Sequence, residues 1–158
     1  MGIAAGFEAA VSTVGGVLTD PYPPDFRTLG LAGCIDRLAT PLREQGTAVR
    51  WDTPHWGIEI PADCAFLLYQ SAREALSNTY KYAHAAHVTV RLAAVDHGIR
   101  LVVSDDGTGF DSQLAVSGRH HGYGLRLMSV AVRSAGGTVS VTSSPGSGAQ
   151  VSVTLPLD

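Results

Sequence analysis

The amino-acid sequence predicts an α+β fold, a two-layer α/β sandwich in which a mixed, mostly antiparallel sheet carries helices on one face. The first observation is the order of the periodic segments: helix, strand, helix, strand, strand, helix, strand, strand. The second is that only short runs of turn-forming residues separate two of the strand pairs, as in β-hairpins. The third is the length of 158 residues, enough for one domain with a substantial core.

The composition argues against several classes of protein. Apolar residues make up 45% of the chain and charged residues 16%, which is typical of a folded globular domain. The net charge is −3 and no basic block occurs, so we expect no nucleic-acid partner. The sequence has no run as long as a transmembrane helix and lacks the basic start of a signal peptide. We therefore expect a cytoplasmic domain that reaches a membrane only through parts outside this chain.

Residues 1–25 differ from the rest of the chain. They are small, polar and rich in Gly and Pro, and they end in the rigid run PYPP at 21–24. Such a composition is typical of a linker or of the frayed end of a longer element. We therefore assign residues 1–25 to a linker or to the end of a preceding region, and residues 26–158 to the folded domain.

Three elements are expected in the first half of the domain. Apolar positions at helical spacing predict a helix over residues 29–45, closed by Gly46. A short strand is expected over residues 47–52. Pro61 suits the first position of a helix, which predicts a second helix over residues 62–83.

The second half is expected to contain two hairpins and one more helix. The first hairpin turns at Asp96-His97-Gly98, and residues 106–121 form a loop rich in Gly, Ser and His. The expected elements are strands at 87–92 and 99–104, a helix at 125–135, and strands at 138–143 and 150–155.

The helix expected over residues 62–83 carries a row of polar side chains. At about 100° per residue, Ser71, Glu74, Asn78 and Lys81 fall close together, opposite the apolar positions. Such a row is usually the solvated face of an amphipathic helix. It also suits the wall of a metal–phosphate site, because Glu74 and Asn78 lie one turn apart and can reach the same ligand. The helix alone leaves both interpretations open.

Two glycine clusters follow this helix. The stretch SDDGTGF at 104–110 lacks the alternating acids of an EF-hand and the GK[ST] of a Walker loop, and on its own it is compatible with a plain turn. The stretch GYGL at 122–125 opens the next expected helix. Glycines there let the backbone approach a ligand closely, and free N–H groups at a helix N-terminus attract phosphate.

The order of the motifs is more specific than any one of them. REALSN at 73–78, DDGTGF at 105–110, GYGL at 122–125 and PGSG at 145–148 precede a last strand that ends in LP. This set resembles the ATP-binding domain of sensor histidine kinases, within the gyrase–Hsp90–histidine kinase–MutL ATPase superfamily. The resemblance is strongest to the subfamily that acts with nitrate/nitrite-type response regulators, and it covers the chain from Leu29 onward. It implies a Bergerat-type ATP-binding fold with ATP and Mg²⁺ as cofactors.

The resemblance also implies roles for individual side chains. Asn78 would ligate the Mg²⁺ that bridges the phosphates, and Glu74 would polarise the attacking group or support the metal. Lys81 would face the phosphates. Asp105 would accept a hydrogen bond from the adenine amine.

The other implied binding groups belong to the backbone. Gly107 and Gly109 would let adenine sit close. Gly122, Gly124 and the backbone of Leu125 would cradle the phosphates under a short lid at 111–121.

General chemistry agrees with these roles. A carboxylate only accepts hydrogen bonds, so Asp105 can select an N–H donor over a carbonyl. Mg²⁺ prefers one or two protein oxygens together with phosphate and water, which suits Asn78. Phosphoryl transfer needs mainly positioning and charge neutralisation, which a closing lid would assist.

Three positions depart from the pattern of the subfamily. Tyr82 stands where a histidine usually follows the lysine, and Leu127 replaces a common glycine after GxGL. Ala149 replaces a threonine whose hydroxyl is expected to hold a water in the adenine site. These changes predict weaker nucleotide binding.

In the resembling kinases the phosphate passes to a histidine on a separate dimerisation helix, beside an acidic residue. None of the six histidines here has that context. The resemblance therefore implies a catalytic domain that phosphorylates its own dimerisation domain, of which residues 1–25 would be the end, with a response regulator downstream. Two alternatives stay open: a serine kinase of the anti-sigma-factor type, and a degenerate ATP-sensing module.

Overall fold

The computed structural model describes residues 30–52, 60–108, 123–143 and 146–157. The predicted linker at 1–25 and the predicted lid at 111–121 lie outside these ranges. The elements are α2 (Gly30–Leu38), α3 (Thr40–Glu44), β1 (Ala48–Asp52), α4 (Ala62–Asn78), the π-helical segment η2 (Thr79–Ala83), β2 (His87–Val95), β3 (Gly98–Asp105), α6 (Tyr123–Ser134), β4 (Thr138–Ser143) and β5 (Ala149–Pro156).

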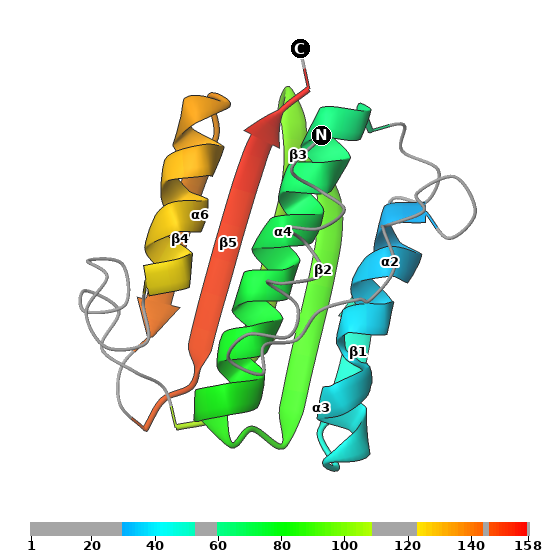
Figure 1. The fold of residues 1–158 in the computed structure, drawn as a ribbon, viewed down its shortest axis with the longest axis vertical. Coiled ribbons are helices and arrows are strands. Elements are labelled where there is room, and N and C mark those ends of the chain that lie inside the picture. The colour runs from blue at the N-terminus through cyan, green and yellow to red at the C-terminus, as the bar shows by residue number, and fades with distance from the viewer. Residues whose placement is uncertain (1–29, 53–59, 109–122, 144–145, 158) are drawn as a thin grey trace, which may run out of the picture.

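The strands form one mixed sheet, as the sequence predicts. Its strand order is β1-β2-β3-β5-β4. β1 pairs with β2 in parallel, and the other neighbours pair antiparallel. Figure 1 shows the helices on one face of this sheet, with α4 between α2 and α6. The predicted two-layer α+β architecture is confirmed.

The first predicted helix, residues 29–45, is two helices. α2 ends at Leu38, and α3 begins at Thr40 with Pro41 in its first turn. Proline has no backbone N–H and its ring clashes with the preceding turn, so a continuous helix is unfavourable there. The break at Ala39 is the physical consequence of Pro41.

The second predicted helix changes its geometry near its end. It is α-helical through Asn78 and then π-helical from Thr79 to Ala83. His84 ends the segment in the left-handed conformation, with φ of 51°. π-helical turns are rare and occur frequently at functional sites, because they change the direction of the residues that follow.

The core lies between the helices and the sheet. α4 contributes Leu68, Ala72 and Leu76, all fully buried, and β3 contributes Ile99 and Leu101. Within the described residues, no helix combines the length and the apolar character needed to cross a membrane.

The polar row of α4 is not a solvated face. Ser71 is 0% exposed and Asn78 is 8% exposed. Ser71 donates its hydroxyl hydrogen to the Leu67 carbonyl oxygen at 2.8 Å. The interpretation as a solvated face is therefore wrong for these two residues. α6 packs against α4, with its Gly124 beside Glu74 of the same polar row.

Candidate functional site

One end of the domain brings four chain segments together. The C-terminal ends of α4 and β3 and the N-terminal end of β5 lie near the lower edge of Figure 1, and the N-terminal end of α6 also points downward in this view. A pocket opens between them. The residues lining it are Ala75, Asn78, Thr79, Ala83, Val103, Asp105, Leu125, Ala149 and Val151. Three residues that the sequence singled out, Asn78, Asp105 and Leu125, therefore line one pocket.

Asp105 is the acidic residue of this pocket. Its carboxylate accepts hydrogen bonds from the Gly107 backbone N–H at 2.8 Å and from the Thr79 hydroxyl at 3.4 Å. Burial raises the pKa of the Asp105 carboxyl, and the hydrogen bonds from Gly107 and Thr79 offset part of this effect. The apolar surroundings and the fixed orientation make this carboxylate a specific acceptor for one N–H donor in the pocket.

Asp106, the neighbouring acid, has a structural role. Its carboxylate accepts hydrogen bonds from the backbone N–H groups of Ala86 and His87, each at 2.9 Å. The other carboxylate oxygen lies 2.7 Å from Nδ1 of His87. These hydrogen bonds from the His87 backbone and ring hold the pKa of the Asp106 carboxyl below its ordinary range. Asp106 thus fixes the start of β2.

Two glycines allow the backbone to close around Asp105. A Cβ at Gly107 would overlap the backbone carbonyl of Ala83, because Thr108 donates its N–H to that carbonyl at 2.7 Å. A Cβ at Gly148 would overlap the carbonyl of Asp105, and Gly148 has a φ of +80°. Gly107 is therefore required by contact with the end of η2, whatever it contributes to a ligand.

Asn78 presents an unsatisfied amide to the pocket. Its Nδ2 is buried and has no hydrogen-bond partner within the described part of the chain. Buried polar groups are almost always paired in folded proteins, so an orphan beside a pocket indicates a ligand. An amide offers an oxygen as well as N–H groups, and rotation about its terminal bond exchanges the two. The residue therefore fits a phosphate oxygen or a Mg²⁺ ion bound to phosphate.

Glu74 lies where α4 meets α6. A Cβ at Gly124 would overlap the Glu74 carboxylate, so glycine is what allows the carboxylate to lie against the first turn of α6. Burial raises the pKa of the Glu74 carboxyl, and the positive charges of Arg73 and Lys81 offset part of this effect. The structure thus brings together Glu74 and Gly124, two residues that the resemblance implicated separately.

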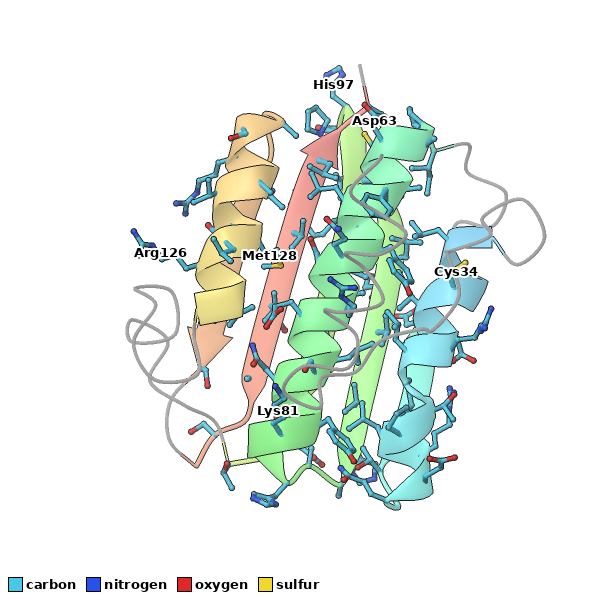
Figure 2. The ribbon with its side chains drawn as sticks, viewed as in Figure 1. Cys34, Asp63, Lys81, His97, Arg126 and Met128 are labelled. Atoms are coloured by element: carbon cyan, nitrogen blue, oxygen red, sulfur yellow. The ribbon has the colours of Figure 1, made fainter. Side chains whose placement is uncertain are left out.

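Lys81 lies in η2, at the end of α4 (Figure 2). Its side chain is half-buried, and its charge acts on Glu74. Gly109 and Gly122 lie outside the described residues, as does the side chain of Tyr82. Leu127, one of the departures from the subfamily pattern, is 54% exposed on α6.

Thr79 is a pocket residue that the sequence analysis missed. At about 100° per residue it falls on the apolar side of the helix, and it is only 4% exposed. Its single hydroxyl hydrogen is shared between the Ala75 carbonyl oxygen, at 3.1 Å, and the Asp105 carboxylate, at 3.4 Å. A threonine directly after Asn78, on an otherwise apolar face, was the available signal. Ala149 lines the same pocket, so a methyl group is present where the subfamily pattern has a threonine hydroxyl.

Comparison with known protein families identifies the class of protein to which this site belongs. Residues 65–158, more than half of the chain, match the family described as Histidine kinase-, DNA gyrase B-, and HSP90-like ATPase. The chain belongs to this ATPase family. The predicted resemblance is confirmed, and the pocket lies in the ATP-binding domain of that family.

Several relatives of this ATPase domain are sensor kinases. Over 129 residues it is 32% identical to the Sensor histidine kinase LiaS of Bacillus subtilis, covering 81% of this chain and 33% of that protein. Over 96 residues it is 36% identical to the Nitrate/nitrite sensor protein NarX of Escherichia coli K12, covering 61% of this chain and 16% of that protein. The chain thus spans a third or less of the length of these two relatives.

Solved structures show the same fold. The histidine kinase domain of the Erythrobacter litoralis EL346 blue-light activated histidine kinase superposes with a TM-score of 0.64 at 19% identity, covering 96% of this chain and 69% of that chain. The Acinetobacter baumannii histidine kinase AdeS superposes with a TM-score of 0.67 at 15% identity, covering 85% of this chain and 66% of that chain. At these identities the similarity establishes the fold alone.

Proposed function

We propose that this ATPase-family domain binds Mg·ATP and donates the γ-phosphate to a histidine on a separate dimerisation domain of a two-component sensor kinase. The observation that carries the proposal is the pairing of Asp105 with Asn78 in one pocket. The first is a half-buried, acceptor-only group, and the second is a buried amide whose nitrogen has no hydrogen-bond partner among the described residues.

The proposal divides the pocket into a base end and a phosphate end. At the base end, Asp105 accepts a hydrogen bond from the adenine amine, while Val103, Ala149 and Val151 contact the ring. The acceptor selects adenine over guanine, which presents a carbonyl at the corresponding position. The Thr79 hydroxyl adjoins the same carboxylate and holds it in place.

At the phosphate end, Asn78 supplies the protein oxygen for Mg²⁺, and the metal neutralises charge on the phosphates. The N–H groups of the first turn of α6, at Gly124 and Leu125, bind phosphate oxygens together with Gly122. Lys81 adds a positive charge, and Glu74 polarises the attacking group or supports the metal. Gly109 keeps the loop after β3 close to the base.

The same proposal covers the partners of the domain. Residues 1–25 would be the end of the dimerisation region that carries the acceptor histidine, and a response regulator would receive the phosphate next. The domain would work in the cytoplasm. The sensor kinases among its relatives support this assignment.

Calorimetry with ADP and Mg²⁺ tests the first half of the proposal. The protein should bind ADP, and Asp105→Asn should weaken binding by about 10- to 100-fold, since a neutral amide oxygen is a weaker acceptor than a carboxylate and the amide NH2 group cannot accept from the adenine amine. Asp96→Asn, in the exposed hairpin turn between β2 and β3, is the matched control and should bind normally. Absence of ADP binding in the unmodified protein would refute the nucleotide assignment.

Phosphotransfer tests the second half. Radiolabelled ATP is mixed with this chain and a dimerisation domain of a sensor kinase that carries its acceptor histidine. Acid-labile label on that domain supports a histidine kinase. Acid-stable label on a protein partner would instead indicate a serine kinase of the anti-sigma-factor type. Nucleotide binding without any transfer would indicate the degenerate ATP-sensing module.

A further inference from the structure

Glu74 places a negative charge where the proposed function requires phosphate. Its carboxylate lies against Gly124, the second residue of α6, and only the missing Cβ at that position makes room for it. The 12-residue helix α6 points its N-terminal turn toward the pocket, which Leu125 of that turn lines. The carboxylate and a nucleotide phosphate would therefore compete for the same surface.

The first turn of a helix attracts anions through its free N–H groups and the positive end of the helix dipole. A carboxylate satisfies this preference as a phosphate does. Glu74 is also largely buried, and burial weakens the screening that water provides between like charges. The positive charges of Arg73, on α4, and Lys81, on η2, act on the Glu74 carboxylate.

We infer that Glu74 is an internal anion at the phosphate-binding turn of α6, which repels the phosphates of a nucleotide and makes binding depend on a divalent cation. The inference rests on the proposed function. It assigns Glu74 a role in the metal dependence of binding, separate from any role in the transfer step. The cation would neutralise the phosphates that approach Glu74, and Asn78 would supply its protein ligand.

The experiment measures affinity rather than activity. Calorimetry gives the dissociation constants of adenosine, AMP and ADP for the unmodified protein and for Glu74→Gln, each with Mg²⁺ and with EDTA. Glutamine keeps the size of the side chain and removes its charge. Glu44→Gln, at an exposed position at the end of α3, is the control for loss of one negative charge.

The expected result is a gain in binding affinity that increases with the negative charge on the phosphates of the ligand. In EDTA, Glu74→Gln should bind ADP roughly tenfold tighter than the unmodified protein, AMP less so, and adenosine equally. With Mg²⁺ the two proteins should converge, so the ratio of affinities with and without Mg²⁺ falls in the variant. Glu44→Gln should behave as the unmodified protein does.

Equal or weaker binding of Mg²⁺-free ADP by Glu74→Gln, with adenosine affinity unchanged, would overturn the inference. Failure of the unmodified protein to bind adenosine and ADP would instead refute the proposed function. Circular dichroism checks that the variant is folded. If it is not, Glu74→Ala, which leaves free space beside Gly124, is subjected to the same comparison.

Discussion

Two adjacent aspartates at the end of β3 face different partners. The carboxylate of Asp105 turns into the pocket, where Thr79 and Gly107 hold it. The carboxylate of Asp106 binds the backbone at the start of β2. Side chains alternate between the two faces of a strand, so neighbours in sequence meet different surroundings. Of the pair, only Asp105 is placed to select a ligand.

Thr79→Val removes the hydroxyl beside Asp105 and keeps the shape of the side chain. We expect ADP affinity to fall by about threefold to tenfold, the effect of one hydrogen bond. The variant also removes a bond to the ionised carboxylate, so the pKa of Asp105, already raised by burial, should rise further. Binding needs the ionised form and is lost as pH falls through that pKa, so the loss should begin at higher pH in the variant. Calorimetry across a pH series measures both effects.

Thr138→Val, on β4, is the control for this substitution, because Thr138 is exposed and does not line the pocket. An unchanged pH profile in Thr79→Val would show that the hydroxyl does not hold Asp105 in its ionised form.

At the scale of elements, the pocket depends on the junction between η2 and the loop after β3. The Ala83 carbonyl oxygen accepts the Thr108 N–H, and Gly107 passes directly beside it. Because the obstructing atom is backbone, a side chain at Gly107 could be accommodated only by moving η2 or the loop. η2 carries the pocket residues Thr79 and Ala83, and the loop begins directly after Asp105, so this junction couples packing to binding.

Gly107→Ala should therefore lower both stability and affinity. We expect the free energy of unfolding to fall by about 1–3 kcal/mol, as for overpacking elsewhere, and ADP affinity to fall with it. Gly137→Ala is the matched control, because Gly137 precedes β4 and its Cβ would overlap the backbone carbonyl of Thr154 on β5, away from the pocket. Urea unfolding and calorimetry distinguish the two: Gly137→Ala should lose stability alone. Normal ADP binding by Gly107→Ala would contradict the coupling.

Across the whole molecule, the site is assembled by the sheet. β3 and β5 are antiparallel neighbours, with Asp105 opposite Ala149 in the register. The end of one strand and the start of the other therefore meet at the same edge, and α4 and α6 cover that edge from one side. Ligand contacts would thus link segments that are distant in sequence.

Such a ligand should stabilise the fold as a unit. With ADP and Mg²⁺ at about 100 times the dissociation constant, binding adds about 2.7 kcal/mol to the free energy of unfolding. For a domain of this size the midpoint of thermal unfolding should rise by roughly 5–10 °C. Differential scanning calorimetry measures the shift, and Asp105→Asn should reduce it by about half or more. An equal shift in that variant would mean that ADP binds elsewhere.

Much of the fold follows from local sequence patterns. The positions of the helices and strands agree with the periodic segments, and the turn near Asp96 joins β2 to β3 as predicted. Pro41 was itself a signal for the break between α2 and α3, which the apolar periodicity alone concealed. The motifs around Asn78 and Asp105 identified the family, and the family match bears this out.

By itself, the sequence determined the element order, the family and two of the pocket's polar groups, because these depend on spacing within segments and on the order of motifs along the chain. Only the tertiary structure decided that Ser71 and Asn78 are buried, that Thr79 contacts Asp105, and that Glu74 lies against α6. Thr79 and Asp105 are 26 positions apart. Periodicity specifies which residues share a face of an element, whereas the surface that covers this face is chosen by packing between elements.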